Sequence, residues 1–122
     1  MSFIFVALGG ALGSMARYAV SLIPVKTAFP VLTLLTNIVG AVLIGFIVGV
    51  TGVRGGVSNN TILFWKTGVC GGFTTFSTFS LEAFHLIDNK QYATGGIYVV
   101  LSCACCIAGI LFGKKLSALV RV

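Results

Sequence analysis

Four long apolar stretches take up most of this chain, and they constrain its fold more than any other feature. They run from Phe3 to Ile23, from Val31 to Val53, from Thr61 to Ile87 and from Tyr92 to Gly113. An α-helix needs roughly 20 apolar residues to cross the hydrocarbon core of a bilayer, and each stretch is long enough. The pattern therefore predicts an all-α, multi-pass membrane protein of four transmembrane helices, with residues 1–122 forming a single transmembrane domain.

Charged residues are too few for a water-soluble domain. They make up 8% of the 122 residues, whereas soluble domains carry about 25%. The net charge of +6 comes from cations scattered singly near the ends of the apolar stretches, which favours interfacial anchoring over nucleic-acid binding. Because the links between the stretches are short, neighbouring helices are predicted to run antiparallel. An even number of spans places both termini on one side of the membrane.

The third stretch departs from a simple spanning helix. Only 15 uncharged residues separate Lys66, interpreted as a snorkelling anchor, from Glu82; as a straight helix they would cover roughly 22 Å of a core about 30 Å thick. The pair Gly71–Gly72 precedes a run with five hydroxyl residues among seven, which is unfavourable for a lipid-facing helix. A discontinuous helix, surrounded by protein or a water-filled cavity, is therefore predicted near Gly71 to Thr75. A kinked structural helix, with hydroxyls bonded to its backbone, is the alternative.

Several polar side chains lie inside the apolar stretches, where they are costly and often functional. Asn37 is about two turns into the second stretch, near Thr33, and Arg17 is late in the first. Tyr98 and Ser102 are four residues apart in the fourth stretch, so they share a helical face. For Asn37 an interhelical hydrogen bond is an equal alternative to a functional role. Arg17, taken alone, favours a snorkelling anchor near a helix end.

Glycine pairs and cysteines have structural interpretations. Glycines four residues apart occur in every stretch, which predicts close helix packing and a narrow passage between helices. These pairs are Gly9/Gly13, Gly45/Gly49, Gly68/Gly72 and Gly109/Gly113. The four cysteines are interpreted as small buried apolar residues rather than as a zinc site. With two acidic residues in the chain and no catalytic motif, an enzyme is not expected.

Three short segments carry a resemblance to a known family. The strongest reads GGFTTFSTF from Gly71 to Phe79; the weaker ones are GGALG from Gly9 to Gly13 followed by Arg17–Tyr18, and Thr36–Asn37 with Gly40. Together with the four short spans they make the chain similar, over its full length, to the Fluc (CrcB) family of fluoride channels. The resemblance implies a fluoride-selective channel that exports fluoride passively across the bacterial plasma membrane.

The resemblance also implies an assembly. In that family two oppositely oriented copies form an antiparallel homodimer with two pores, and some members instead form heterodimers of two oppositely biased chains. The cations divide five to three between the predicted membrane faces, with Arg54, Lys66, Lys114, Lys115 and Arg121 on one and Arg17, Lys26 and Lys90 on the other. A bias this small does not fix orientation under the positive-inside rule. It is consistent with dual insertion, and it favours the homodimer over a heterodimer with a paralogue.

A fluoride pore makes a definite chemical demand. Fluoride is small and strongly hydrated, so a selective pore must replace its water with hydrogen-bond donors and positive partial charges. The rims of aromatic rings are electropositive, and in the family phenylalanines form a box whose ring edges meet the anion. The candidate donors for such a pore are the hydroxyls and amide of Asn37, Thr33, Ser77, Thr78, Tyr98 and Ser102. By resemblance Phe76 and Phe79 line it too, and Arg17 and Glu82 are assigned to a vestibule.

The helix break has an implied role of its own. Where a helix ends, its last carbonyls have no intrahelical partner and form the negative end of the helix dipole. By resemblance, the backbone carbonyls of Gly71 and Thr74 from each subunit hold one central Na⁺, whose role is structural.

Two other functions fit parts of the pattern. A small dual-topology multidrug-type exporter also has four spans, but it needs a carboxylate embedded in its first span, which here contains neither Asp nor Glu. A non-transporting membrane assembly subunit would explain the glycines but not the cluster of Thr, Ser and Phe in the third stretch.

Overall fold

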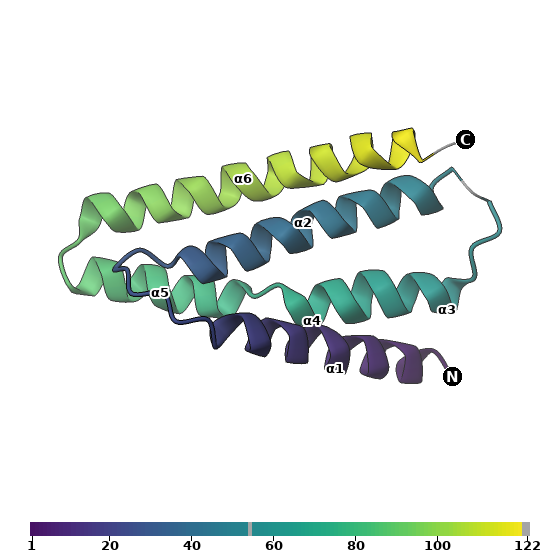
Figure 1. Ribbon diagram of the computed structural model, residues 1–122, viewed down its shortest axis with the longest axis horizontal. Coiled ribbons are helices and arrows are strands. Elements are labelled where there is room, and N and C mark those ends of the chain that lie inside the picture. Colours follow the sequence, from purple (N-terminus) through teal and green to yellow (C-terminus); the bar gives the residue numbers. More distant parts are fainter. Residues whose placement is uncertain (54, 121–122) are drawn as a thin grey trace.

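The fold is a bundle of helices, described by a computed structural model that covers residues 1–53 and 55–120. The first, second and fourth stretches form single helices: α1 (Ser2–Ser21), α2 (Val31–Thr51) and α6 (Tyr92–Leu119). The third stretch is divided into α3 (Asn59–Ile62), the π-helix η1 (Leu63–Cys70), α4 (Gly71–Phe73) and α5 (Phe76–Asp88). Figure 1 shows the four stretches running side by side, the third interrupted near its middle. The predicted all-α fold with a broken third helix is confirmed.

Three helices of the described chain, α1, α2 and α6, are long and apolar enough to cross a membrane. α1 begins and α6 ends at the same end of the bundle (Figure 1), which agrees with the predicted even number of spans. Of the cations assigned to membrane faces, Arg54 and Arg121 lie outside the described residues.

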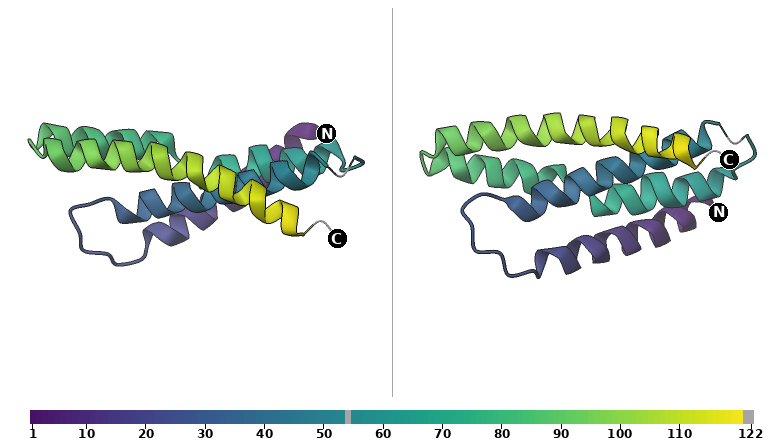
Figure 2. Two further views of the ribbon diagram at one scale, coloured as in Figure 1. Left: turned by 90° about the horizontal axis from the view of Figure 1, so that it is seen from above. Right: turned by 45° about the horizontal axis from the view of Figure 1, so that its top comes forward.

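The helices pack at the predicted glycine pairs. α1 packs against η1 and α4, and α2 packs against α6, which it crosses in the views of Figure 2. A Cβ added at Gly13 would collide with the backbone carbonyl of Val69, and one added at Gly113 would collide with that of Val42. Backbones this close exclude any side chain at these positions, so the absence of a side chain is what sets the helix spacing.

A cluster of buried apolar side chains lies between α5 and α6. It consists of Phe79, Ala83, Leu86 and Tyr98, with Phe29 and Leu34 packed against it. Elsewhere many large apolar side chains face outward along α1, α2 and α6. In water such a surface would cause aggregation, whereas in a membrane it faces lipid or a partner. The buried α5–α6 cluster lies next to the polar groups described below and includes two of the predicted site residues, Phe79 and Tyr98.

Candidate functional site

The helix break lies at Thr74 and Thr75, whose backbones are extended (φ/ψ −77°/157° and −148°/113°). The Thr74 hydroxyl donates to the carbonyl of Cys70 at 2.8 Å, which closes the end of α4. The Thr75 hydroxyl accepts from the N–H of Thr78 at 3.1 Å and so forms the N-cap of α5. Threonine is favourable at an N-cap, and this local chemistry places the predicted discontinuity here.

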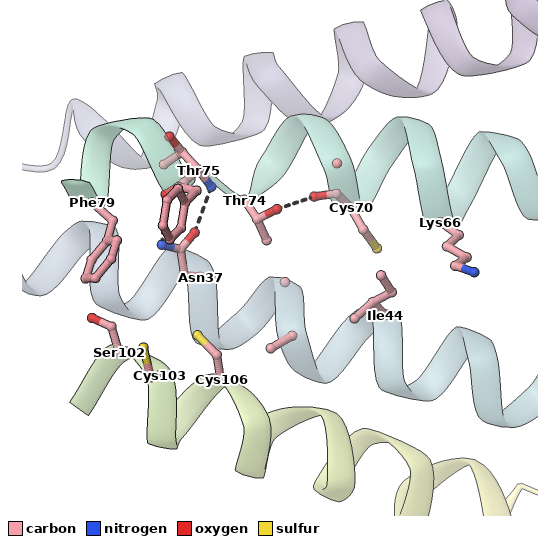
Figure 3. A pocket seen from close by; sticks show the side chains of 14 residues that line it. Asn37, Ile44, Lys66, Cys70, Thr74, Thr75, Phe79, Ser102, Cys103 and Cys106 are labelled. Carbon is pink, nitrogen blue, oxygen red and sulfur yellow. Dashed lines mark hydrogen bonds between the residues drawn. The ribbon is translucent and has the colours of Figure 1, made fainter. Parts of the chain in front are cut away.

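Asn37 on α2 holds this break in place. Its Nδ2 donates to the carbonyl of Thr75 at 3.1 Å, and its Oδ1 accepts from the N–H of the same residue at 2.8 Å (Figure 3). The expected interhelical hydrogen bond therefore exists, and Asn37 also lines the cavity described below. Within the described residues the two bonds engage one of the amide's two N–H groups, which leaves the second as a donor for a ligand.

Two carbonyls at the break lack their usual helical donors. In a continuous helix the N–H of Thr75 would bond the carbonyl of Gly71, but here it donates to Asn37. The N–H of Thr78 would likewise bond the carbonyl of Thr74, but it donates to the hydroxyl of Thr75. The caps that create the break thus release the carbonyl oxygens of Gly71 and Thr74, the two positions implied as sodium ligands.

Arg17 reaches the same break from α1. Its Nε donates to the carbonyl of Gly72 at 3.1 Å, so this arginine does more than anchor its helix at the interface. Arg17 also lines a cavity of about 350 Å³ together with the hydroxyl groups of Thr33, Thr75 and Thr78. We call this the second cavity, to distinguish it from the first cavity described in the next paragraph. Arg17 is the residue with a charged side chain among those that line it.

A first cavity, also of about 350 Å³, lies between α2, η1, α5 and α6. Its wall contains Asn37, Phe76, Phe79 and Ser102, with Lys66 near one end (Figure 3). Ser102 is only 6% exposed, and its hydroxyl oxygen has no hydrogen-bond partner within the described chain. A buried hydroxyl without a partner is costly. Because Ser102 lines the cavity, its hydroxyl is a candidate donor to a ligand bound there.

The two phenylalanines of the motif sit side by side but in different surroundings. The ring centroids of Phe76 and Phe79 are 5.5 Å apart. Phe79 is 8% exposed and packs on Tyr98 at 5.2 Å, so it belongs to the α5–α6 cluster as well as to the cavity wall. Phe76 is 79% exposed, so its ring projects from the protomer surface.

Three further predicted residues form one hydrogen-bonded group. Glu82 accepts from the hydroxyl of Tyr98 and from that of Thr33, each at 2.7 Å. Tyr98 is fully buried, whereas Glu82 and Thr33 line a third cavity of about 150 Å³. Thr33 lines the second cavity too, so the two cavities meet at this residue.

Not every predicted residue is brought to a cavity. Ser77 is exposed and lines none of the three cavities in the described chain; its hydroxyl lies 3.4 Å from that of Thr75. Conversely, Lys66 and Cys106 line the first cavity although neither was predicted to. The spacing of four between Ser102 and Cys106 could have indicated Cys106.

The arrangement suits the binding of an anion. Donors line the first two cavities, each cavity has one cation in its wall, and neither is lined by an acidic side chain of the described chain. The described residues contain no cluster of His, Cys, Asp or Glu that could hold a metal ion. These cavities can therefore solvate a small anion with hydroxyl and amide donors.

Comparisons with known proteins give a consistent result. A family model described as CrcB-like protein, Camphor Resistance (CrcB), matches residues 4–114. Three relatives carry the name fluoride-specific ion channel FluC. The protein of Methanococcus vannielii is 37% identical over 95% of both chains. That of Nitrobacter winogradskyi is 46% identical over 86% of this chain and 89% of its own. That of Clostridium perfringens is 39% identical over 93% of this chain and 91% of its own.

Proposed function

This chain belongs to the CrcB-like protein family, and we propose that it is a fluoride-selective ion channel. The observation that carries the proposal is the similarity over nearly the whole chain to proteins named for this function. The first cavity supplies a physical basis, because within the described residues the buried Ser102 hydroxyl has no hydrogen-bond partner and the Asn37 amide keeps one N–H that is not hydrogen-bonded. Neither the multidrug-type exporter nor the assembly subunit accounts for these donors.

Selectivity for fluoride follows from the small size of the ion. Donors spaced around a narrow passage can replace the water of a small ion more completely than they can that of a larger halide. The edges of Phe76 and Phe79 add positive partial charge beside these donors. We place Thr33 and Thr78, which line the second cavity, along the same route, with Arg17 and Glu82 in its vestibule. Tyr98 joins this route through its hydrogen bond to Glu82, and the exposed Ser77 joins it where a second copy covers the surface of this chain. The passage is passive, so fluoride leaves the cell down its gradient across the bacterial plasma membrane.

We further propose that two oppositely oriented copies form the working unit, with two pores per dimer. One support is the apolar ring of Phe76, which is 79% exposed in the single chain and would be covered by a second copy. The small cation bias between the two predicted faces is the other support. A heterodimer with a paralogue remains the competing assembly, and activity of the chain purified alone decides between them.

The proposed site for a structural Na⁺ consists of the backbone carbonyls of Gly71 and Thr74, which lack their usual helical donors. Oxygen ligands suit a hard cation, and the oxygens of Gly71 and Thr74 have given up their helical donors. Two copies would contribute four such oxygens around a two-fold axis. A bound cation there would offset repulsion between anions in the two pores.

The function is tested with the chain purified alone and reconstituted in liposomes. We expect rapid fluoride efflux and no measurable chloride efflux, because chloride is too large for the donors lining a glycine-packed passage. Efflux is followed with ion-selective electrodes, and empty liposomes serve as the control. Equal efflux of the two halides would contradict the proposal. Proton-coupled export of a cationic drug would support the exporter instead.

Sodium dependence is tested through assembly as well as flux. We expect the dimer to be more stable in sodium than in potassium, by about 2.7 kcal/mol when sodium is present at a hundred times its dissociation constant. In Thr75→Lys an ammonium near the released carbonyls should remove this dependence. Thr75→Ala is the matched control, since both variants lose the N-cap of α5 but only the lysine adds a cation. Equal stability in both salts would contradict the sodium site.

A further inference from the structure

The first cavity contains thiol groups that the proposed function does not use. Cys70, Cys103 and Cys106 all line it, and none of them is in a disulfide. Cys70 is only 2% exposed, Cys103 is exposed and Cys106 is half-buried. Cys106 follows Ser102 by one helical turn, and Figure 3 shows both side chains extending from α6 toward the side of the cavity that holds Asn37. Cys106 is therefore a thiol beside the unpartnered donor of the conduit.

The charge of this cavity is set by Lys66. No acidic side chain of the described residues lines the cavity, so the ammonium of Lys66 is not offset within its wall. Lys66 is exposed and lies at the end of the cavity away from Ser102 and Cys106 (Figure 3), so its charge acts at the entrance, where it raises the local concentration of anions and lowers that of cations. A negatively charged reagent should therefore reach Cys106 more often than a positively charged one of similar size.

We propose that Cys106 is a covalent modification site inside the conduit, that it reacts preferentially with small anionic thiosulfonates because Lys66 attracts them, and that the adduct stops the passage of anions. The blocking part of this inference rests on the proposed function. The reaction is an ordinary thiol exchange. The thiol gives its proton to water, the thiolate attacks the reagent sulfur to form a new S–S bond, and the S–SO₂ bond breaks to release a sulfinate.

The volume of the first cavity supports the proposal that an adduct on Cys106 blocks the passage of anions. A cavity of about 350 Å³ has room for several water molecules, but an adduct on Cys106 would occupy the space next to Ser102. A sulfonate on that adduct would also place a fixed negative charge in the route of the anion. Both effects act on the same segment of α6.

The test uses the purified chain with anionic sulfonatoethyl methanethiosulfonate and its cationic trimethylammonioethyl analogue. Tandem mass spectrometry identifies the modified cysteine, and liposome efflux is measured before and after labelling. We expect Cys106 to react roughly tenfold faster with the anionic reagent, and Lys66→Gln to abolish that preference. Labelling should remove most of the fluoride efflux, and a reducing agent should restore it.

Matched variants separate the block from other effects. The comparison is made in a Cys103→Ala background, because Cys103 is exposed and lines the same cavity. In that background Cys106→Ala should keep its own efflux after treatment, whereas Cys105→Ala should still be blocked, because Cys105 does not line the cavity. An unlabelled Cys106, or equal rates for the two reagents, would overturn the modification site even if fluoride efflux is intact. A labelled Cys106 with unchanged efflux would overturn the block. If the untreated chain carries no fluoride, the proposed function fails, while the labelling rates still decide the site.

Discussion

Changing Asn37 to aspartate is expected to lower fluoride efflux by roughly a thousandfold. A fixed negative charge about 4 Å from a passing anion costs about 4 kcal/mol at an effective dielectric constant of 20, and each 1.4 kcal/mol is about a factor of ten. Asn37 lines the first cavity, so the new charge would act on the anion there. Liposome efflux of the purified variant measures the effect.

A structural role of Asn37 makes a different prediction, which a second variant exposes. The side chain holds the helix break through two hydrogen bonds to the backbone of Thr75. Aspartate keeps the oxygen that accepts from the N–H but puts a carboxylate oxygen where Nδ2 donates to the carbonyl of Thr75, so Asn37→Asp and Asn37→Ala both disturb the break. A purely structural role therefore predicts that the loss of efflux follows the loss of thermal stability and dimer in both variants. An anion conduit predicts that aspartate passes far less fluoride than alanine when the two variants are equally stable and assembled. Equal efflux at equal stability would remove Asn37 from the conduit.

The spans and the position of the break could be predicted because both depend on local chemistry. Membrane insertion follows from the apolar content of about 20 consecutive residues. The break follows from Gly71–Gly72 and from the hydroxyl residues after them, which close one helix and cap the next. Neither feature requires knowledge of what the third stretch packs against.

The contacts between spans could not be predicted, because they depend on how the helices are rotated and aligned. Arg17 bonds the carbonyl of Gly72, 55 residues away, and Thr33 bonds Glu82, 49 residues away. The alignment comes from backbones meeting at glycines such as Gly13 and Gly113, where hydropathy carries little information. The sequence therefore named Thr33 and Glu82 as candidates without indicating that they form one group.

Lys66 was interpreted as an interfacial anchor because the sequence does not show how its helix is rotated. Composition places a lysine near the end of an apolar stretch at the interface, and it does not distinguish a side chain that faces lipid from one that lines a cavity. The structure places Lys66 in the wall of the first cavity, together with Ser102 and Cys106 of α6. No local sequence pattern connects Lys66 to that helix. Cys106 was interpreted as an apolar filler for the same reason.

Phe76→Ile is expected to lower fluoride efflux by about tenfold, which corresponds to the loss of about 1.5 kcal/mol of aromatic-edge interaction. Isoleucine keeps much of the apolar bulk but lacks the electropositive ring edge. Phe76 is the better test of the motif because its ring is 79% exposed, so the change disturbs little packing within the protomer. Phe79→Ile should lower efflux as well, but Phe79 is 8% exposed and packs on Tyr98, so part of that effect would come from the core.

A control on the same helix separates the ring edge from the general loss of an aromatic side chain. Phe84 is 59% exposed on α5 and lines none of the cavities in the described chain. Phe84→Ile should therefore change efflux by no more than about twofold, in keeping with the small effects of most surface substitutions. Cross-linking or gel filtration must show the same dimer fraction in both variants, since a lost dimer would also lose its pores. If Phe76→Ile assembles and conducts like Phe84→Ile, the exposed ring contributes only bulk, and the anion must be solvated by the hydroxyl and amide donors alone.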